Sequence, residues 1–383
     1  MDYKKLAKHH QVASLNILAD IGTLAKNTPN LIDLSIGDPD LITDDRIIQQ
    51  AFLDVKNGHT KYTESGGSAD LIESILSFYQ RFYQLSFEKD QVRATVGALH
   101  GMYLTLQTIL DAGDEVIIHE PYFSPYKDQV VNSGGVPVFI PTYEKDGFAI
   151  DIAVLEAAIT NKTKALILNS PNNPTGAVFS QETFKQIAEL AKKYDFFILS
   201  DEVYDGFSFY DEFVPMATYA PDHTVTFGSL SKNFSMTGWR IGYMVAPSYL
   251  NAAAKLLNEG ITYSAPTPSQ RAAIYALDHA EELIPKVSEV FKERLEYVAQ
   301  RVAEIPYLSL HPLKGSIYAF INISKTGMDS MAFSQYVLQE TQVLVIPGLA
   351  FGESGDRYVR LAATQNREIL TEAFNRLAQL TFD

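Results

Sequence analysis

Seven short apolar runs, separated by helical patterns, fill the middle of the chain between residues 91 and 247. Each run has the length and β-branched content of a buried strand. The segment 180–194 repeats its apolar residues at helical spacing with Ser180 as an N-cap, and 104–110 is also typical of a helix. Such alternation predicts an α/β fold with one large, mostly parallel seven-stranded sheet covered by helices. The runs are residues 92–96, 115–119, 136–140, 165–169, 196–200, 225–227 and 242–245.

The C-terminal part of the chain has a different pattern. Residues 248–305 are helical in character with a break at 264–268, and short strands are expected at 316–321, 343–346 and 358–361, before a closing helix at 367–380. A chain of 383 residues is too long for one ordinary core. We therefore predict a large domain over residues 41–285 and a small α+β domain over 286–383. The N-terminal segment, residues 1–40, is expected to join the small domain. The Gly- and Ser-rich stretch 58–71 is expected to be a loop between helices.

Composition excludes several classes of protein. Hydrophobic residues make up 46% and charged residues 20%, which is typical of a globular chain, and the net charge of −15 opposes nucleic-acid binding. The absence of Cys excludes disulfides and thiolate chemistry. The polar N-terminus and the lack of a long apolar stretch predict a cytoplasmic location. His9 and His10 are the closest histidine pair, in a polar stretch, so no metal site is predicted.

The segment SLSKNFSMTGWRIG, residues 229–242, carries the chemistry that is most specific. It follows the predicted strand 225–227, so Lys232 should lie beyond the carboxyl end of the sheet, where ligands bind in open α/β folds. A lysine whose pKa is lowered by its surroundings becomes a nucleophile for carbonyl groups. Arg240 is a candidate phosphate clamp through its planar guanidinium group.

This segment resembles the cofactor-lysine signature of the class I/II aminotransferase family of fold type I. The resemblance implies that Lys232 binds pyridoxal 5'-phosphate as an internal aldimine and later moves the proton of the substrate α-carbon. It also implies that Ser229 and Arg240 bind the cofactor phosphate, with Ser231 as a third candidate. The activity expected is a ping-pong transfer of an amino group between an L-amino acid and a 2-oxo acid.

Two further motifs follow predicted strands at the same end of the sheet. Asp201, in SDEVY, suits the carboxylate that must face the pyridine nitrogen, because a protonated ring is the electron sink. By itself Asp201 would more often be a helix N-cap. The resemblance assigns Tyr204 and Asn173, in SPNNPTG, to the cofactor's phenolic oxygen, whereas Asn172 is expected to be structural.

The turn TVGALHG at residues 95–101 leads from a strand into a helix, whose free amide groups form an anion site. The resemblance places the cofactor phosphate on the amides of Ala98 and Leu99. It also aligns Phe123 with the aromatic residue that stacks on the pyridine ring, although many relatives have Trp or Tyr there. Without the resemblance, Phe123 would be a core residue.

The substrate and partner groups come from distant segments. Arg360 fits the arginine that binds the substrate α-carboxylate, and alternation along its strand would bury it if Val359 faces outward. Gly37, in LSIGDP, resembles the glycine whose backbone closes over that carboxylate. Tyr62 resembles a tyrosine that reaches the phosphate of a partner subunit, which implies a homodimer.

Three other functions compete with transamination. A pyridoxal-phosphate-dependent C–S β-lyase of the cystathionine or cysteine type would share Lys232, Asp201 and Arg360. A nucleotide-dependent dehydrogenase or NTPase is disfavoured, because neither of the glycine-rich phosphate motifs follows a strand. A non-enzymatic regulatory domain would have lost the site residues. The sequence does not identify the amino donor.

Overall fold

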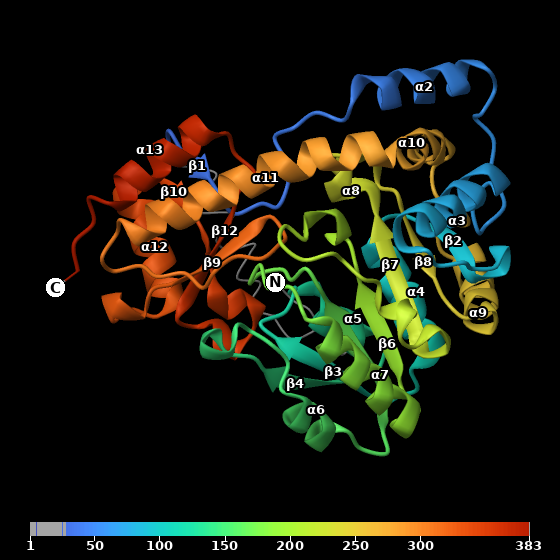
Figure 1. Cartoon of the computed structure of the whole chain (residues 1–383), viewed down its shortest axis with the longest axis horizontal. Coiled ribbons are helices and arrows are strands. Elements are labelled where there is room, and N and C mark those ends of the chain that lie inside the picture. Colours follow the sequence, from blue (N-terminus) through green and yellow to red (C-terminus); the bar gives the residue numbers. More distant parts are fainter. Residues whose placement is uncertain (1–4, 6–24, 26–27, 383) are drawn as a thin grey trace.

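The computed structural model describes Lys5, Ala25 and residues 28–382, and a seven-stranded sheet lies at its centre (Figure 1). The strand order is β2-β8-β7-β6-β5-β3-β4. Strands β3 to β7 are parallel to one another, whereas β8 is antiparallel to both β2 and β7. The predicted α/β fold is confirmed. The strands are β2 (Val92–Thr95), β3 (Glu115–Glu120), β4 (Val136–Pro141), β5 (Thr163–Asn169), β6 (Phe197–Asp201), β7 (Thr224–Ser229) and β8 (Gly242–Val245).

Helices cover both faces of this sheet. Successive residues of a strand point to opposite faces, so Ile117 and Ile118 of β3 are both fully buried, each in a different apolar cluster. The helix predicted at 180–194 forms α7, and the Ser180 side chain accepts a hydrogen bond from the Thr183 amide at 3.1 Å, as expected of its N-cap. The covering helices are α4 (Ala98–Ile109), α5 (Pro125–Asn132), α6 (Ile152–Ala158), α7 (Gln181–Tyr194) and α9 (Ser248–Glu259).

A second group of helices lies beside the sheet, where α10 packs against α2 and α3 (Figure 1). Helix α3 begins at Ala69 because Ser68 caps it, so the predicted loop at 58–71 was too long at its C-terminal end. The long α11 then leads from this group towards the C-terminal elements. The bounds are α2 (Asp45–Lys56), α3 (Ala69–Tyr83), α10 (Thr267–Asp278) and α11 (Ala280–Ala303).

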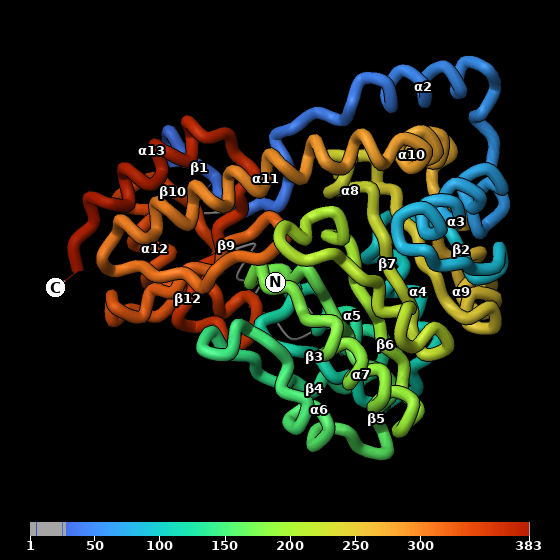
Figure 2. The backbone as a smooth tube through the Cα atoms, in the orientation of Figure 1, coloured from blue at the N-terminus to red at the C-terminus, as the bar shows by residue number. Residues whose placement is uncertain are grey.

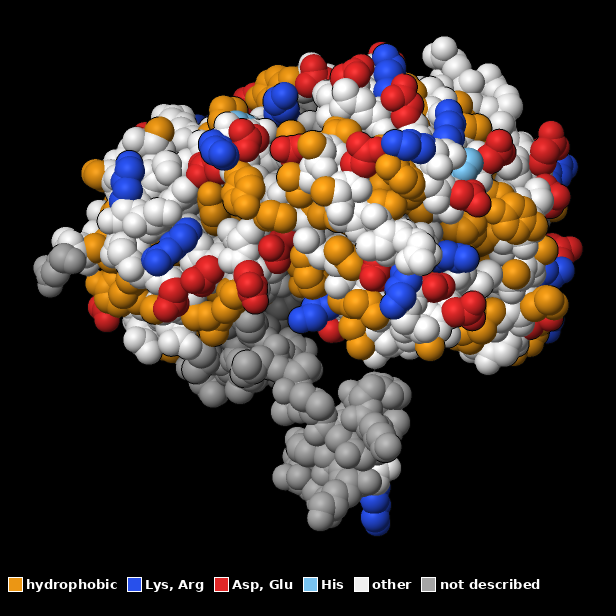
Figure 3. Space-filling view, turned by 90° about the horizontal axis from the view of Figure 1, so that it is seen from below, with side chains coloured by type: hydrophobic (Ala, Val, Ile, Leu, Met, Phe, Trp, Pro, Cys, Tyr) orange, Lys and Arg blue, Asp and Glu red, His pale blue; other side chains and the backbone are white. Residues whose placement is uncertain are grey.

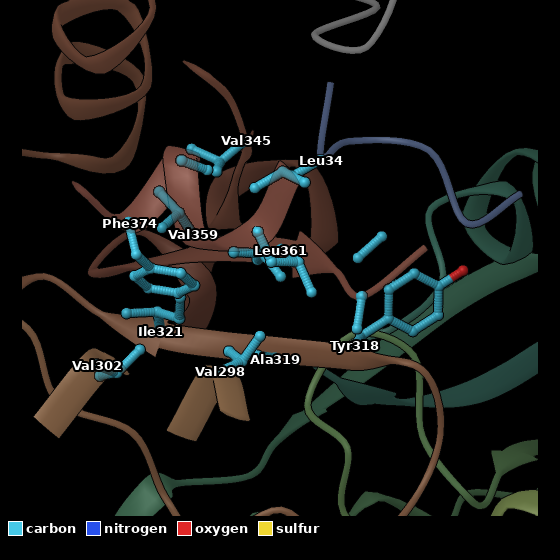
Figure 4. Packing of buried hydrophobic residues seen from close by; sticks show 14 of the residues in the cluster. Leu34, Val298, Val302, Tyr318, Ala319, Ile321, Val345, Val359, Leu361 and Phe374 are labelled. Atoms are coloured by element: carbon cyan, nitrogen blue, oxygen red, sulfur yellow. The ribbon is translucent and has the colours of Figure 1, made fainter. Parts of the chain in front are cut away.

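The C-terminal part is built on a three-stranded antiparallel sheet with the order β11-β12-β9. The prediction that residues 343–346 form a single strand was wrong. The first half of this segment pairs with β1 and its second half with β12, so the two halves belong to different sheets. Figure 4 shows the apolar core here, in which Val298 of α11, Ile321 and Leu361 are buried. The elements are β1 (Ile32–Asp33), β9 (Tyr318–Asn322), α12 (Ser330–Thr341), β10 (Val343–Leu344), β11 (Ile346–Pro347), β12 (Tyr358–Ala362) and α13 (Arg367–Leu377).

The N-terminal strand β1 crosses to the C-terminal elements, where it pairs with β10 in parallel (Figure 2). The division into residues 1–40, 41–285 and 286–383 stays a prediction, and its boundary at 285/286 falls inside α11, which contains Pro285. Within the described ranges, none of the helices combines the length and apolar character that crossing a bilayer requires. On the face shown in Figure 3, acidic and basic side chains are interspersed.

Candidate active site

A cavity of about 790 Å³ lies at the carboxyl ends of β5, β6 and β7, and β12 closes it from the C-terminal part. Twelve of the thirteen residues predicted for the site line it, so segments that are far apart in the sequence meet as expected. These residues are Gly37, Ala98, Leu99, Phe123, Asn173, Asp201, Tyr204, Ser229, Ser231, Lys232, Arg240 and Arg360.

Lys232 is held in the cavity by a short helix, α8 (Leu230–Asn233), which follows β7 directly. The Ser229 hydroxyl caps this helix by accepting a hydrogen bond from the Ser231 amide at 3.1 Å. The Lys232 ammonium group donates to the carbonyl oxygen of Gly37. The lysine therefore points across the cavity towards the segment that was predicted to close over a substrate.

Asp201 ends β6 and is buried with an exposed fraction of 7%. Its carboxylate accepts a hydrogen bond from the Tyr126 hydroxyl at 2.5 Å and one from the Val203 amide at 3.3 Å. Burial raises the pKa of Asp201 to about 6, although both hydrogen bonds act against this rise. A buried carboxylate of this kind is stabilised by a cationic donor, and no described residue supplies one as an ion pair.

Arg360 lies on the central strand β12 with an exposed fraction of 7%. Its guanidinium group donates to Asn173 Oδ1 at 3.0 Å and to the Ser35 carbonyl, while its buried Nε has no partner among the described residues. The rings of Tyr318 and Phe351 lie 4.5 and 4.7 Å from the guanidinium carbon. Burial lowers the pKa of Arg360, which indicates a cation that lacks a counter-ion.

The condition that Val359 faces outward, under which alternation would bury Arg360, is not met. Val359 is only 3% exposed, because β12 is the central strand of its sheet and is covered on both faces. Arg360 is nevertheless buried, but by the rings that enclose it rather than by an exposed neighbour.

The SPNNPTG turn orients Asn173 towards Arg360. The backbone amide of Asn173 donates a hydrogen bond to Asn169 Oδ1 at 2.8 Å. Its side-chain oxygen accepts a hydrogen bond from Arg360, so the side-chain nitrogen, Nδ2, is the group that can donate to a ligand. Asn172 instead accepts from the amide and the hydroxyl of Thr175, at 3.0 and 2.7 Å. Asn172 therefore shapes the turn, as its sequence position indicated.

An anion site is present where α4 begins. Gly97 precedes the helix with a φ of +76°, and no side chain caps the helix, so its first amides lack a capping partner. Ala98 and Leu99, the first two residues of the helix, line the cavity. A Cβ atom at Gly97 would lie 2.8 Å from Nη2 of Arg240. Only a glycine lets the backbone and this guanidinium group approach so closely, which suits the binding of a phosphate between them.

Tyr62 is the one predicted residue that does not line the cavity of its own chain. Its side chain is 86% exposed and packs edge-on against Tyr263, with ring centroids 5.4 Å apart.

Two tyrosines and one backbone group in the site were missed from the sequence. Tyr126 lies in the first turn of α5, and its ring contacts that of Phe123 with centroids 5.5 Å apart, but no motif in the sequence marks it. The Tyr318 hydroxyl accepts a hydrogen bond from the Tyr204 hydroxyl at 3.1 Å, and the Arg360 guanidinium group lies over the Tyr318 ring. The sequence of β9 contains no motif that would predict this role. The Ser35 carbonyl was not predictable, because backbone acceptors leave no sequence signal.

These residues fit pyridoxal 5'-phosphate. The buried Asp201, which has no cationic partner, suits a protonated pyridine nitrogen, and the start of α4 with Arg240 suits a phosphate. Lys232 lines the same cavity as these groups. Among the described residues, no group of three or more His, Cys, Asp or Glu is arranged to hold a metal ion. The pair His9 and His10 lies outside the described residues.

Comparisons with known proteins agree with this site. Residues 29–377 match the family model described as "Aminotransferase class I and II". The chain is 37% identical to an aspartate aminotransferase of Pyrococcus horikoshii, over 92% of this chain and 91% of that protein. It is 35% identical to aromatic-amino-acid aminotransferase 2 of Thermococcus litoralis, over 93% of each chain. Among solved structures, Thermus thermophilus aspartate aminotransferase with maleate superimposes with a TM-score of 0.93. The two sequences are 31% identical, and the match covers 98% of this chain and 99% of that one.

Proposed function

The chain belongs to the class I and II aminotransferase family, and on that premise we propose that Lys232 is the residue at the centre of its chemistry. The protein is a pyridoxal-phosphate-dependent aminotransferase, and its substrates are amino acids and 2-oxo acids. When bound, pyridoxal 5'-phosphate supplies an electron sink that stabilises negative charge on the substrate α-carbon. The C–S lyase alternative is not favoured, because the curated relatives are named as aminotransferases.

The observation that carries the proposal is that two buried charged groups without a counter-ion line the same cavity. Asp201 is an anion without a cation, and Arg360 is a cation without an anion. A protonated pyridine ring would satisfy Asp201, and an α-carboxylate would satisfy Arg360. Lys232 lines the same cavity, so a substrate held by Arg360 lies within the space that the lysine amine reaches.

Each remaining residue then has a defined task. The Lys232 amine takes the α-proton of the substrate and returns it to the cofactor side. Asn173 and Tyr204 hydrogen-bond the phenolic oxygen, and Phe123 packs on the ring. Ser229, Ser231, Arg240 and the amides of Ala98 and Leu99 hold the phosphate, while the Gly37 backbone closes over the substrate.

The proposal extends to a homodimer in which Tyr62 reaches the phosphate of the partner subunit. Its support is the high exposure of Tyr62, next to the exposed Tyr263, on a chain whose relatives are aminotransferases. An exposed tyrosine pair of this kind is typical of a protein interface.

The half-reaction tests the proposed function directly. Holoenzyme mixed with an amino acid, with no oxo acid added, should release one equivalent of 2-oxo acid per active site and no ammonia. Continued release of ammonia with pyruvate from cystathionine would instead identify a lyase. Absence of any oxo acid from a broad panel of amino acids would refute transamination by this protein.

A further inference from the structure

One end of the cavity is apolar. Once the residues assigned to the cofactor and to the α-carboxylate are set aside, the remaining wall comes mainly from the N-terminal stretch and from β10 and β11. Its apolar members are Ala25, Leu31, Ile36, Leu344 and Ile346. This wall is where a substrate side chain must lie, because the other sides of the cavity hold the cofactor and the carboxylate groups.

The strand register places this wall beside the carboxylate clamp. Ile346 of β11 pairs directly with Arg360 of β12, so the two residues are cross-strand neighbours. Leu344 pairs with Asp33 of β1 in the separate two-stranded sheet, two residues before Ile346 in the chain. A substrate whose carboxylate binds Arg360 therefore meets apolar side chains as soon as it extends away from that group.

The charged residues that line the cavity also favour an uncharged substrate side chain. Among the described residues that line it, the cations are Lys232, Arg240 and Arg360, and each has a task already. The other charged side chains in the wall are acids. Asp33 accepts from the amide and hydroxyl of Ser35, at 2.8 and 2.5 Å, and Asp38 accepts from the Thr237 hydroxyl at 2.6 Å.

Among the described residues of this chain, no further cation lines the cavity, so a second carboxylate on the substrate would be desolvated beside an apolar wall and near two acids. We propose that this site prefers neutral, apolar amino acids such as leucine, methionine and phenylalanine over dicarboxylic ones. The inference rests on the proposed function and adds a substrate class to it. It separates this chain from relatives whose names specify aspartate.

Binding of unreactive carboxylates tests the inference without turnover. Holoenzyme is titrated with 3-phenylpropionate and with maleate, and the dissociation constants are measured by calorimetry and by the change in cofactor absorbance. We expect 3-phenylpropionate to bind at least about tenfold more tightly, which corresponds to about 1.4 kcal/mol. Equal binding, or tighter binding of maleate, would overturn the inference.

Turnover separates a failure of this inference from a failure of the proposed function. We expect kcat/KM for leucine or phenylalanine to exceed that for aspartate by at least about tenfold. If aspartate or glutamate is the best donor, or if lysine or ornithine is, the apolar preference is refuted while transamination stands. If no donor yields an oxo acid, the proposed function itself fails.

Ile36 offers a matched pair of variants. Its side chain lines the cavity but is 61% exposed, and its carbonyl is anchored by the Thr364 hydroxyl at 2.9 Å, so the backbone should tolerate substitution. Ile36→Arg adds a cation to the apolar wall, and Ile36→Gln is the neutral polar control. We expect the arginine variant alone to shift the ratio of dicarboxylic to apolar turnover, by about tenfold or more. An equal shift in both variants would contradict the charge argument.

Discussion

The hydroxyl group of Tyr126 donates a 2.5 Å hydrogen bond to Asp201, and both residues are buried in the wall of the cavity. The bond joins α5 to the end of β6 and favours the charged form of a carboxylate whose pKa burial raises to about 6. Tyr126 is therefore a positioning residue for the group that faces the cofactor ring. It lies outside every motif that the sequence offered.

Substitution of Tyr126 by phenylalanine should weaken cofactor binding. Removing the donor raises the pKa of Asp201 further, so less carboxylate is available to pair with a protonated ring. We expect the dissociation constant for pyridoxal 5'-phosphate to rise by about tenfold, as for loss of one hydrogen bond to a charged group. Absorbance titration of the cofactor-free protein measures this, with Asp201→Asn as the more severe variant. Unchanged affinity in Tyr126→Phe would show that the bond has no such role.

Replacement of Arg360 by lysine should raise KM for every amino acid. Lysine keeps the charge but loses the planar pair of donors, and it cannot also hold Asn173 and the Ser35 carbonyl. We expect kcat/KM to fall by at least about 30-fold, which corresponds to about 2 kcal/mol. Steady-state kinetics with several donors measure it. A fall confined to one donor would mean that Arg360 recognises a side chain instead of the shared α-carboxylate.

Much of the fold could be predicted because strand runs, helix caps and βα turns are local signals. The positions of Lys232, Asp201 and Asn173 followed from one rule, that parallel strands bring their carboxyl ends to the same edge. The split of the predicted strand 343–346 could not be foreseen, because pairing with β1 on one side and β12 on the other is a long-range choice. The same holds for Tyr318, whose contact with Arg360 depends on strand register.

Glu202 should make stability depend on pH. Burial raises the pKa of its carboxyl group to about 8, whereas the ordinary value is 4.5. Between these values the folded protein keeps a proton that the unfolded chain releases, so the free energy of unfolding falls as pH rises through this window. The slope from one such group is at most about 1.4 kcal/mol per pH unit.

Glu202→Gln isolates this effect. Both hydrogen bonds to Glu202, from the Ser200 hydroxyl and the Met216 amide, end on the same oxygen, which glutamine retains. We expect the free energy of unfolding in urea to fall less between pH 6 and pH 8 in the variant than in the native protein. The variant keeps the raised pKa of Asp201, but this affects stability mainly below about pH 6. Parallel pH profiles for the two proteins would refute the assignment.

Mixing two inactive variants tests whether Tyr62 acts across a dimer. In a hybrid of Lys232→Ala and Tyr62→Ala chains, the site that keeps Lys232 receives an intact Tyr62 from the other chain. We expect this hybrid to regain about half of the native activity per dimer, with tighter cofactor binding than Tyr62→Ala alone. No recovery, despite hybrids detected by native mass spectrometry, would show that Tyr62 does not act across the dimer.

The central claim is that Lys232 is the residue that binds the cofactor. Reduction of the holoenzyme with borohydride fixes the cofactor covalently to whichever lysine holds it, and peptide mass spectrometry then identifies that residue. We predict one pyridoxyl group per chain, on Lys232 alone, and none on a Lys232→Ala variant treated in the same way. A pyridoxyl group on another lysine in the native protein, with Lys232 unmodified, would contradict the account.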